Sequence, residues 1–256
     1  MANIQLGDVL TWYDDHGDQD SEPVVLLHSA FVDSRMFAPA LPRLGERFHV
    51  FTVDRRGHGR TPDVDGPITY ELMAQDMIAF LEKVVEGPAH LVGHSDGAIV
   101  AMIVALRRPD LVRKLVLISG NFRYDGLVPG VLEGFADEVV LDVLGPRYGQ
   151  VSPDGEAHFP VVVRKLLRMA AQEPTLTEGD LADISARTLV AAGDDDAVTL
   201  EHTIALYRAI PDSELAIVPG TSHLLVMEKP DEVYALVTDF LVNDPILTRQ
   251  PIRRAP

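Results

Sequence analysis

The chain has 256 residues, of which 46% are hydrophobic, and it contains no cysteine. A chain of this length and hydrophobicity can bury a large core, so we expect a folded globule and exclude disulfides and thiol chemistry. The formal net charge of −17 repels phosphate backbones and anionic lipids, which argues against binding to nucleic acid or to a membrane surface.

Strand and helix patterns alternate along the first part of the chain. Residues 4–14 alternate between apolar and polar well enough for an opening hairpin. Residues 24–28 and 49–54 predict strands, with a helix over 34–44 between them. Residues 70–85 carry apolar side chains at helical spacing, which predicts an amphipathic helix.

The most informative stretch is residues 93–97, which read Gly-His-Ser-Asp-Gly. The mostly apolar run 89–92 before it suits the end of a buried strand, and the apolar run 98–106 after it is long enough for a helix. The two glycines leave room for a tight turn and for close approach of the helix to the strand. This context predicts that the hydroxyl of Ser95 is exposed on a sharp strand-to-helix turn.

The strand–helix rhythm is interrupted once in the second half of the chain. After a predicted strand at 112–119, residues 121–183 are rich in glycine and proline and contain candidate helices at 129–144 and 160–171. Alternation then resumes with two strands and two helices: a strand at 188–192, a helix at 200–209, a strand near Ile217 and a helix at 231–241. Such alternation implies an α/β fold, a parallel sheet with helices on both faces.

Two later segments supply the partners that a serine nucleophile needs. A serine hydroxyl is a poor nucleophile until a base removes its proton and a third group orients that base. One predicted strand ends at Gly193 and is followed by the aspartates 194–196, and the next strand is followed by His223. Loops at the carboxyl ends of parallel strands gather over the ligand crevice. The arrangement Ser95, Asp196, His223 therefore has the order and context of a catalytic triad.

These motifs resemble the α/β-hydrolase superfamily, and within it the single-domain esterases, lactonases and C–C hydrolases. The resemblance extends over roughly residues 4–243 and is carried by five segments: 24–30, 54–61, 93–97, 193–196 and 219–223. It implies a single domain over residues 1–256. It also implies a mostly parallel eight-stranded sheet and a small helical cap, residues 121–183, inserted after the sixth strand. By this likeness the acid is Asp196, and its two neighbours Asp194 and Asp195 have no triad role.

The resemblance also implies two backbone N–H donors that would hold the oxyanion. One is that of Asp96, at a helix start where unpaired N–H groups point at an anion. The other is that of Ala30, with Phe31 as the alternative, because this chain has serine at position 29 where the family usually has glycine. We expect the substrate pocket to include four residues: His28, Phe31, Asn121 and Phe122.

The activity implied by the resemblance is hydrolysis of a small to medium carboxylic ester or lactone through an acyl-enzyme. A serine at the turn argues against epoxide hydrolase and haloalkane dehalogenase chemistry, for which this superfamily uses an aspartate nucleophile. Two alternatives remain open: hydrolysis of a carbon–carbon bond next to a ketone, and non-hydrolytic capture of a small molecule in the same pocket. No phosphate loop or dinucleotide fingerprint is present, so we expect no cofactor.

Several residue clusters have a plainer interpretation. Residues 55–60 are basic but match a structural turn of the family, and the three consecutive carboxylates 194–196 do not converge naturally on one ion. His90 and His94 flank a strand end and not one face of a helix, so we expect no metal site. The alternative for Ser95 is a helix-capping role.

The remaining expectations concern location and the end of the chain. No run of about 18 apolar residues is present, so no transmembrane helix is expected. Residues 1–7 lack the basic flank and apolar core of a signal peptide, and we expect a cytoplasmic protein. Residues 244–256 end in a basic, proline-bearing stretch and are expected to form a flexible tail.

Overall fold

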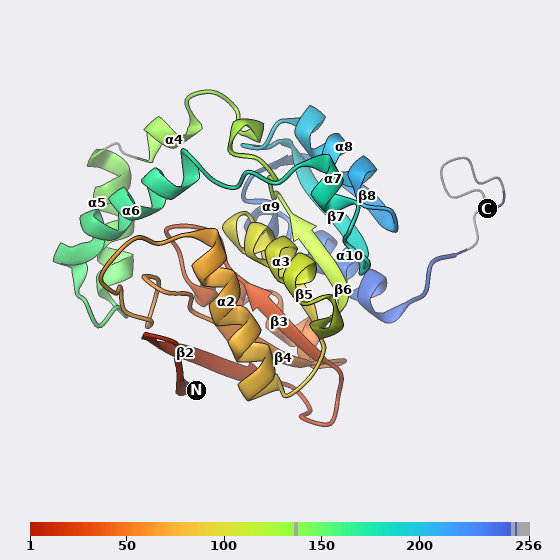
Figure 1. Cartoon of the computed structure of the whole chain (residues 1–256), viewed down its shortest axis with the longest axis horizontal. Helices are drawn as coiled ribbons and strands as arrows, with labels where there is room; N and C mark the ends of the chain where they lie inside the picture. Colours follow the sequence, from red (N-terminus) through yellow and green to blue (C-terminus); the bar gives the residue numbers. More distant parts are fainter. Residues whose placement is uncertain (136–137, 247–248, 250–256) are drawn as a thin grey trace.

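Eight strands form one sheet in the order β1-β2-β4-β3-β5-β6-β7-β8 (Figure 1). Their bounds are β1 (Ala2–Leu6), β2 (Val9–His16), β3 (Pro23–Leu27), β4 (His49–Val53), β5 (Ala89–His94), β6 (Val112–Ile118), β7 (Arg187–Asp195) and β8 (Ser213–Ser222). This computed structural model describes residues 1–135, 138–246 and 249. β1 and β4 pair with β2 antiparallel, and all other neighbouring strands pair parallel. The predicted α/β class with a mostly parallel sheet is confirmed.

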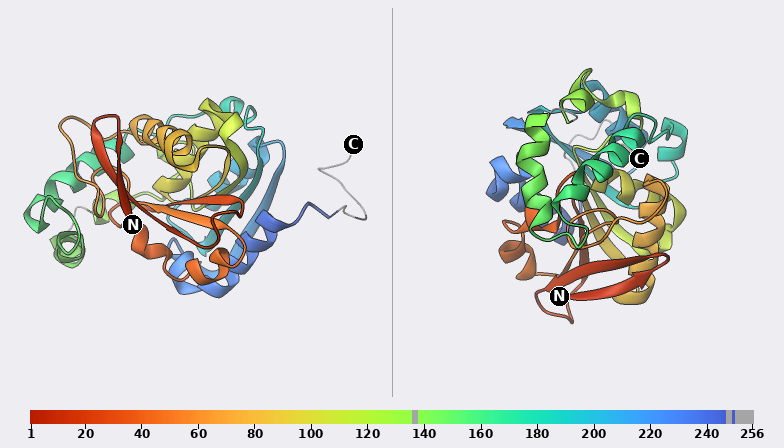
Figure 2. Two further views of the ribbon diagram at one scale, coloured as in Figure 1. Left: turned by 90° about the horizontal axis from the view of Figure 1, so that it is seen from below. Right: turned by 90° about the vertical axis from the view of Figure 1, so that its left-hand side faces the viewer.

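Helices cover both faces of this sheet, as Figure 2 shows. One face carries α2 (Tyr70–Phe80), α3 (Asp96–Arg107) and α8 (Leu200–Ala209), and the other carries α1 (Leu41–Gly45), α9 (Leu225–Glu228) and α10 (Pro230–Val242). Successive side chains of a strand point to opposite faces. In β3, Val25 and Leu27 therefore pack in the core under α2 and α3, whereas Val24 and Leu26 pack in the core under α1 and α10.

Two of the predicted helices are broken at identifiable residues. The predicted helix over 34–44 is a 3-10 turn, η1 (Ser34–Phe37), followed by the short α1, which has Pro42 in its first turn. Proline has no N–H to donate and is tolerated only at the start of a helix, so α1 begins anew there. The predicted helix over 70–85 is α-helical only to Phe80 and ends as a π-turn over Leu81–Val85.

The segment between β6 and β7, residues 121–183, is the helical region that the fold prediction placed there, and we call it the cap region. It contains α4 (Val131–Gly134), α5 (Glu138–Gly149), α6 (Phe159–Ala170) and α7 (Glu178–Leu181). The predicted helix at 129–144 corresponds to α4 and α5, and the one at 160–171 to α6. Figure 1 shows α4, α5 and α6 grouped beyond one end of the sheet.

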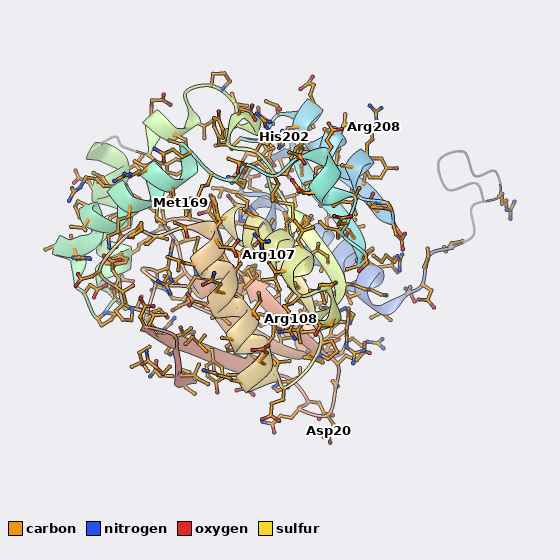
Figure 3. The ribbon with its side chains drawn as sticks, viewed as in Figure 1. Asp20, Arg107, Arg108, Met169, His202 and Arg208 are labelled. Atoms are coloured by element: carbon orange, nitrogen blue, oxygen red, sulfur yellow. The ribbon has the colours of Figure 1, made fainter. Side chains whose placement is uncertain are left out.

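The cap region packs on the same core as α2 and α3. Phe159, Val162 and Met169 are buried in the hydrophobic cluster that also contains the apolar face of α2, and Figure 3 labels Met169 near the start of that helix. Polar contacts add to this packing. Lys165 Nζ lies 2.8 Å from both carboxylate oxygens of Asp63, in the loop after β4. The cap region is thus joined to the sheet layer by apolar and charged contacts.

Two expectations concern the limits of the chain. Within residues 1–135, 138–246 and 249, no helix is both long and apolar enough to cross a bilayer. The predicted tail, residues 244–256, lies outside the described residues except for 244–246 and 249.

Candidate active site

Ser95 lies on the turn between β5 and α3. Its backbone has φ 55° and ψ −119°, a conformation that side-chain-bearing residues rarely adopt and that marks a strained turn. Its N–H donates to the carbonyl of Ile118 over 2.8 Å, which ties the turn to β6. The Ser95 side chain caps no N–H of α3, so the helix-capping alternative does not describe its contacts.

Two glycines let the backbone segments around Ser95 touch. A Cβ added at Gly97 would lie 2.0 Å from the carbonyl oxygen of Leu27, at the end of β3. A Cβ at Gly93 would lie 2.3 Å from the carbonyl oxygen of Gly97. No real Cβ comes that close to a backbone atom, so α3 can start at this point only with glycine on both sides of Ser95, as the sequence predicts.

The carboxyl ends of β7 and β8 bring Asp196 and His223 to Ser95. His223 Nε2 lies 2.9 Å from Ser95 Oγ, and His223 Nδ1 lies 2.7 Å from Asp196 Oδ1. Because the carboxylate can only accept, Nδ1 carries the ring proton and Nε2 is left to accept from the serine hydroxyl. The two neighbouring aspartates have other surroundings: Asp194 accepts from a backbone N–H of β8, and Asp195 is exposed.

Asp196 is held as an anion by its surroundings. Burial of its side chain opposes ionisation, but the hydrogen bond and charge of His223 and the hydrogen bonds from Ser119 and Val198 outweigh that effect and hold the pKa of Asp196 at about 2. Asp196 accepts from four donors in all. The donors are His223 Nδ1, Ser119 Oγ at 2.5 Å, and the N–H groups of Gly193 and Val198, both at 3.1 Å. An aspartate fixed and ionised in this way can orient the imidazole of His223 and stabilise its protonated form.

Ser119 was not among the predicted site residues. Nothing in its local sequence indicates a contact with Asp196, which lies 77 positions further along the chain. The pKa of Asp196 in the fold lies below its ordinary value of 3.8. A donor to this carboxylate therefore stabilises the fold fully above about pH 4, and this stabilisation is lost as the pH falls through about 2.

We expect Ser119→Ala to raise the pKa of Asp196 and to lower the free energy of unfolding by about 1–2 kcal/mol at neutral pH. The difference in the free energy of unfolding between the variant and wild type should shrink as the pH falls from about 4 towards about 2, because Asp196 then becomes protonated in both proteins. Urea unfolding of both proteins over this pH range measures the difference in the free energy of unfolding. A difference that does not depend on pH would contradict the role of Ser119 as a donor to the Asp196 carboxylate.

His94 is a second residue that the sequence did not mark as part of the site. Its Nε2 lies 2.7 Å from the carbonyl oxygen of His223, so this nitrogen must carry the proton and donate it. Burial lowers the pKa of His94 to about 3, which keeps the ring neutral at physiological pH. His94 thus anchors the main chain of His223 while the ring of His223 faces Ser95.

The loop after β3 carries one of the two predicted oxyanion donors. Positive φ occurs in this loop at Phe31 (61°) and not at Ser29, so serine fits where the family usually has glycine. Among the described residues, the N–H groups of Ala30, Phe31 and Asp96 have no hydrogen-bond acceptor. These three N–H groups are therefore available to a ligand oxygen.

A cavity of about 350 Å³ lies between this loop and the cap helices α5 and α6. Its wall is mainly apolar and includes Phe31, Met36, Leu144, Phe159, Val162 and Met227. Phe31 directly follows Ala30, and Met227 is four residues beyond His223, so the cavity shares the loop after β3 and helix α9 with segments next to the predicted site, although neither Ser95 nor His223 forms part of its wall.

Of the four residues predicted to line the pocket, the structure places only Phe31 in the cavity wall. His28 is completely buried and its ring bonds to main-chain groups. Asn121 donates to the carbonyl of Arg123 over 2.8 Å, and Phe122 stacks on His202 with ring centroids 4.1 Å apart. These three residues do not line this cavity, and their side chains contact the loops after β3 and β6 and helix α8; their place in the substrate pocket stays a prediction.

Comparison with known proteins gives a consistent result. The family model described as "Alpha/beta hydrolase family" matches residues 24–236. RutD of Azorhizobium caulinodans, which is named for an inferred carbamate hydrolase activity, is 28% identical over 91% of this chain and 96% of its own length. The 2-(acetamidomethylene)succinate hydrolase of Mesorhizobium japonicum is also 28% identical, over 88% of this chain and 90% of its own length.

Solved structures share the fold. The enol-lactonase from Burkholderia xenovorans LB400 superposes with a TM-score of 0.76 at 22% identity, over 94% of this chain and 100% of that one. The meta-cleavage product hydrolase CumD from Pseudomonas fluorescens IP01 gives 0.78 at 21% identity, over 94% and 97%. Both likenesses concern the fold alone.

Proposed function

Because the chain belongs to the alpha/beta hydrolase family, and is thus a hydrolase of that fold, we propose that it cleaves a small to medium carboxylic ester or lactone through an acyl-enzyme on Ser95. The observation that carries this proposal is the chain of contacts from Ser95 Oγ to His223 Nε2, 2.9 Å, and from His223 Nδ1 to Asp196 Oδ1, 2.7 Å. Both distances allow direct proton transfer and orientation of the base.

In the proposed reaction, Ser95 Oγ attacks the substrate carbonyl carbon while His223 Nε2 takes the hydroxyl proton. Asp196 stabilises the resulting imidazolium, and the N–H groups of Ala30 and Asp96 hold the negative charge on the former carbonyl oxygen. Collapse of the tetrahedral intermediate expels the alkoxide, which takes the proton from His223. Water, deprotonated by His223, then attacks the acyl-enzyme and releases the acid and Ser95.

The cap region, residues 121–183, would wall the acyl or alcohol side of the site as part of a single domain with the rest of the chain. Support comes from its buried side chains, which share one hydrophobic cluster with α2 and α3. Support also comes from the cavity, whose wall combines α5 and α6 with the loop after β3. A largely apolar cavity of this size suits a small organic substrate.

Covalent labelling tests the proposal directly. We expect a fluorophosphonate to add one adduct, which peptide mass spectrometry places on Ser95, and we expect no adduct on Ser95→Ala. Turnover is then measured on p-nitrophenyl esters, lactones and a ketone substrate for C–C cleavage. Carbamates complete the panel because one relative is named for their hydrolysis. An unlabelled Ser95 would refute the nucleophile, and tight binding of a panel compound without turnover would favour a binding protein.

A further inference from the structure

The loop after β3 rests on a buried guanidinium. Arg55, two residues beyond β4, is 1% exposed. Its Nη2 donates to the carbonyl of His28 over 2.5 Å and to that of Ser29 over 3.2 Å, and its Nη1 lies 3.3 Å from Met73 Sδ. In the described part of the chain it forms no direct ion pair. The cation thus binds the main chain of the loop that precedes Ala30.

His28 holds the same carbonyl of Ser29 from a second direction. The backbone N–H of Arg55 donates to His28 Nε2 over 3.0 Å, so this nitrogen is the acceptor and the ring proton is on Nδ1. His28 Nδ1 then donates to the Ser29 carbonyl over 2.7 Å. Burial, together with the charge of Arg55, lowers the pKa of His28, which keeps this ring neutral. The Ser29 carbonyl therefore accepts two hydrogen bonds.

These bonds determine where the N–H of Ala30 points. The Ser29 carbonyl and the Ala30 N–H belong to one planar trans peptide, in which the two groups point in opposite directions. Holding the carbonyl against Arg55 and His28 therefore directs the N–H away from these buried side chains. Donation of hydrogen bonds to the carbonyl also polarises the peptide, which makes its N–H a stronger donor.

The residue that carries the second proposed donor belongs to the same buried cluster. Asp96 is 7% exposed, and its carboxyl accepts from the Tyr70 hydroxyl over 2.8 Å. Burial lowers the pKa of Arg55, and the charge of Asp96 partly offsets that effect. Arg55 thus interacts with the segments that provide both N–H donors, by hydrogen bonds with one and by charge with the other.

Burying Arg55 in this way is unfavourable for folding alone. A cation without a direct counter-ion costs more to bury than an apolar side chain of similar volume. The next residue shows the usual arrangement: Arg56 is also buried, but it pairs with Asp76 at 2.7 Å and with Asp8 at 3.0 Å. Packing alone would therefore favour methionine or leucine at position 55.

We propose that Arg55 is a positioning residue for the oxyanion hole, which holds the Ser29–Ala30 peptide so that the Ala30 N–H meets the developing oxyanion. Arg55 acts through this peptide and does not touch the substrate. The inference rests on the proposed acyl transfer at Ser95. It assigns a role to the residue that the sequence interpretation treated as part of a structural turn.

Arg55→Met should lower kcat about 10- to 100-fold and leave KM within about twofold, because the oxyanion contact forms only in the transition state. The inhibition constant of phenylboronic acid, which forms a tetrahedral adduct on the serine, should rise by a similar factor. Arg55→Lys retains the charge but not the planar guanidinium group with its paired N–H donors. Its kcat should therefore lie between that of Arg55→Met and that of wild type.

Arg56→Met is the matched control, since it removes a buried arginine one position along. We expect it to lower the midpoint of urea unfolding and to leave kcat and boronic acid affinity unchanged. Equal losses in the two variants, or wild-type kcat and boronic acid affinity in Arg55→Met, would overturn the proposal. If Arg55→Met does not fold, wild-type values for Arg55→Lys and Arg55→Gln would overturn it. Full activity of Ser95→Ala would refute the acyl transfer itself, whereas an inactive Ser95→Ala beside a fully active Arg55→Met refutes only the role of Arg55.

Discussion

Replacing Ser95 with alanine is expected to lower kcat/KM on the best ester substrate about ten-thousand-fold or more. The variant loses the oxygen that lies 2.9 Å from His223 Nε2, and the oxyanion donors alone supply a small remaining acceleration. The free energy of unfolding should change little, because the hydroxyl caps no helix N–H and, among the described residues, bonds with His223 alone. Steady-state kinetics on purified protein measures the effect.

Ser222→Ala is the matched control for this experiment. Ser222 immediately precedes His223, and its hydroxyl donates to Glu228 over 2.7 Å, away from Ser95. The same chemical change should therefore leave kcat/KM within about threefold of wild type, since surface substitutions of this kind have small effects. Turnover by Ser95→Ala at a rate close to wild type would contradict the serine mechanism.

Replacing Gly97 with alanine is expected to lower the free energy of unfolding by about 3 kcal/mol or more, because overpacking against rigid backbone cannot relax easily. The new Cβ would lie 2.0 Å from the carbonyl oxygen of Leu27 and 2.8 Å from that of His28. The start of α3 would have to move away from β3, and Ser95 and the Asp96 N–H would move with it. Activity should therefore fall together with stability.

Gly87→Ala separates this effect from the general cost of replacing glycine. A Cβ at Gly87 has no heavy atom within 4 Å and its φ is not left-handed. We expect a change of less than about 1 kcal/mol and full activity. Urea unfolding of both variants, monitored by the single tryptophan, gives the comparison. A Gly97→Ala protein as stable as wild type would show that α3 does not approach β3 as closely as the structure has it.

The fold could be predicted from local patterns because each strand and helix has its own signature. The runs at 89–92 and 188–192 lie within strands of the structure, the run at 24–28 is strand up to Leu27, and the helix predicted at 200–209 has those bounds. The order of nucleophile, acid and base along the chain also sufficed to predict that Ser95, Asp196 and His223 would come together. Their catalytic roles stay predictions until the variants are measured.

The supporting residues could not be predicted, because their roles depend on contacts between distant segments. Ser119 reaches Asp196 from the end of β6, and His94 reaches the carbonyl of His223 from the end of β5. Neither contact follows from periodicity or composition. The hydrogen bonds of His28 could not be predicted for the same reason. A histidine after a strand suggests a site, but hydrogen bonds with Ser29 and Arg55 use both of its ring nitrogens.

The ring of Phe31 stacks on that of Phe135, just beyond α4 in the cap region, with centroids 4.7 Å apart. Phe31 lines the cavity and directly follows Ala30, so the cavity wall, the loop after β3 and the cap region are in contact at this residue. A substrate too bulky for the cavity would push on Phe31, which lines it, and would shift the adjoining peptide of Ala30. Misfit would then slow bond breaking itself, so that the enzyme would discriminate by substrate size through its maximal rate even at saturation.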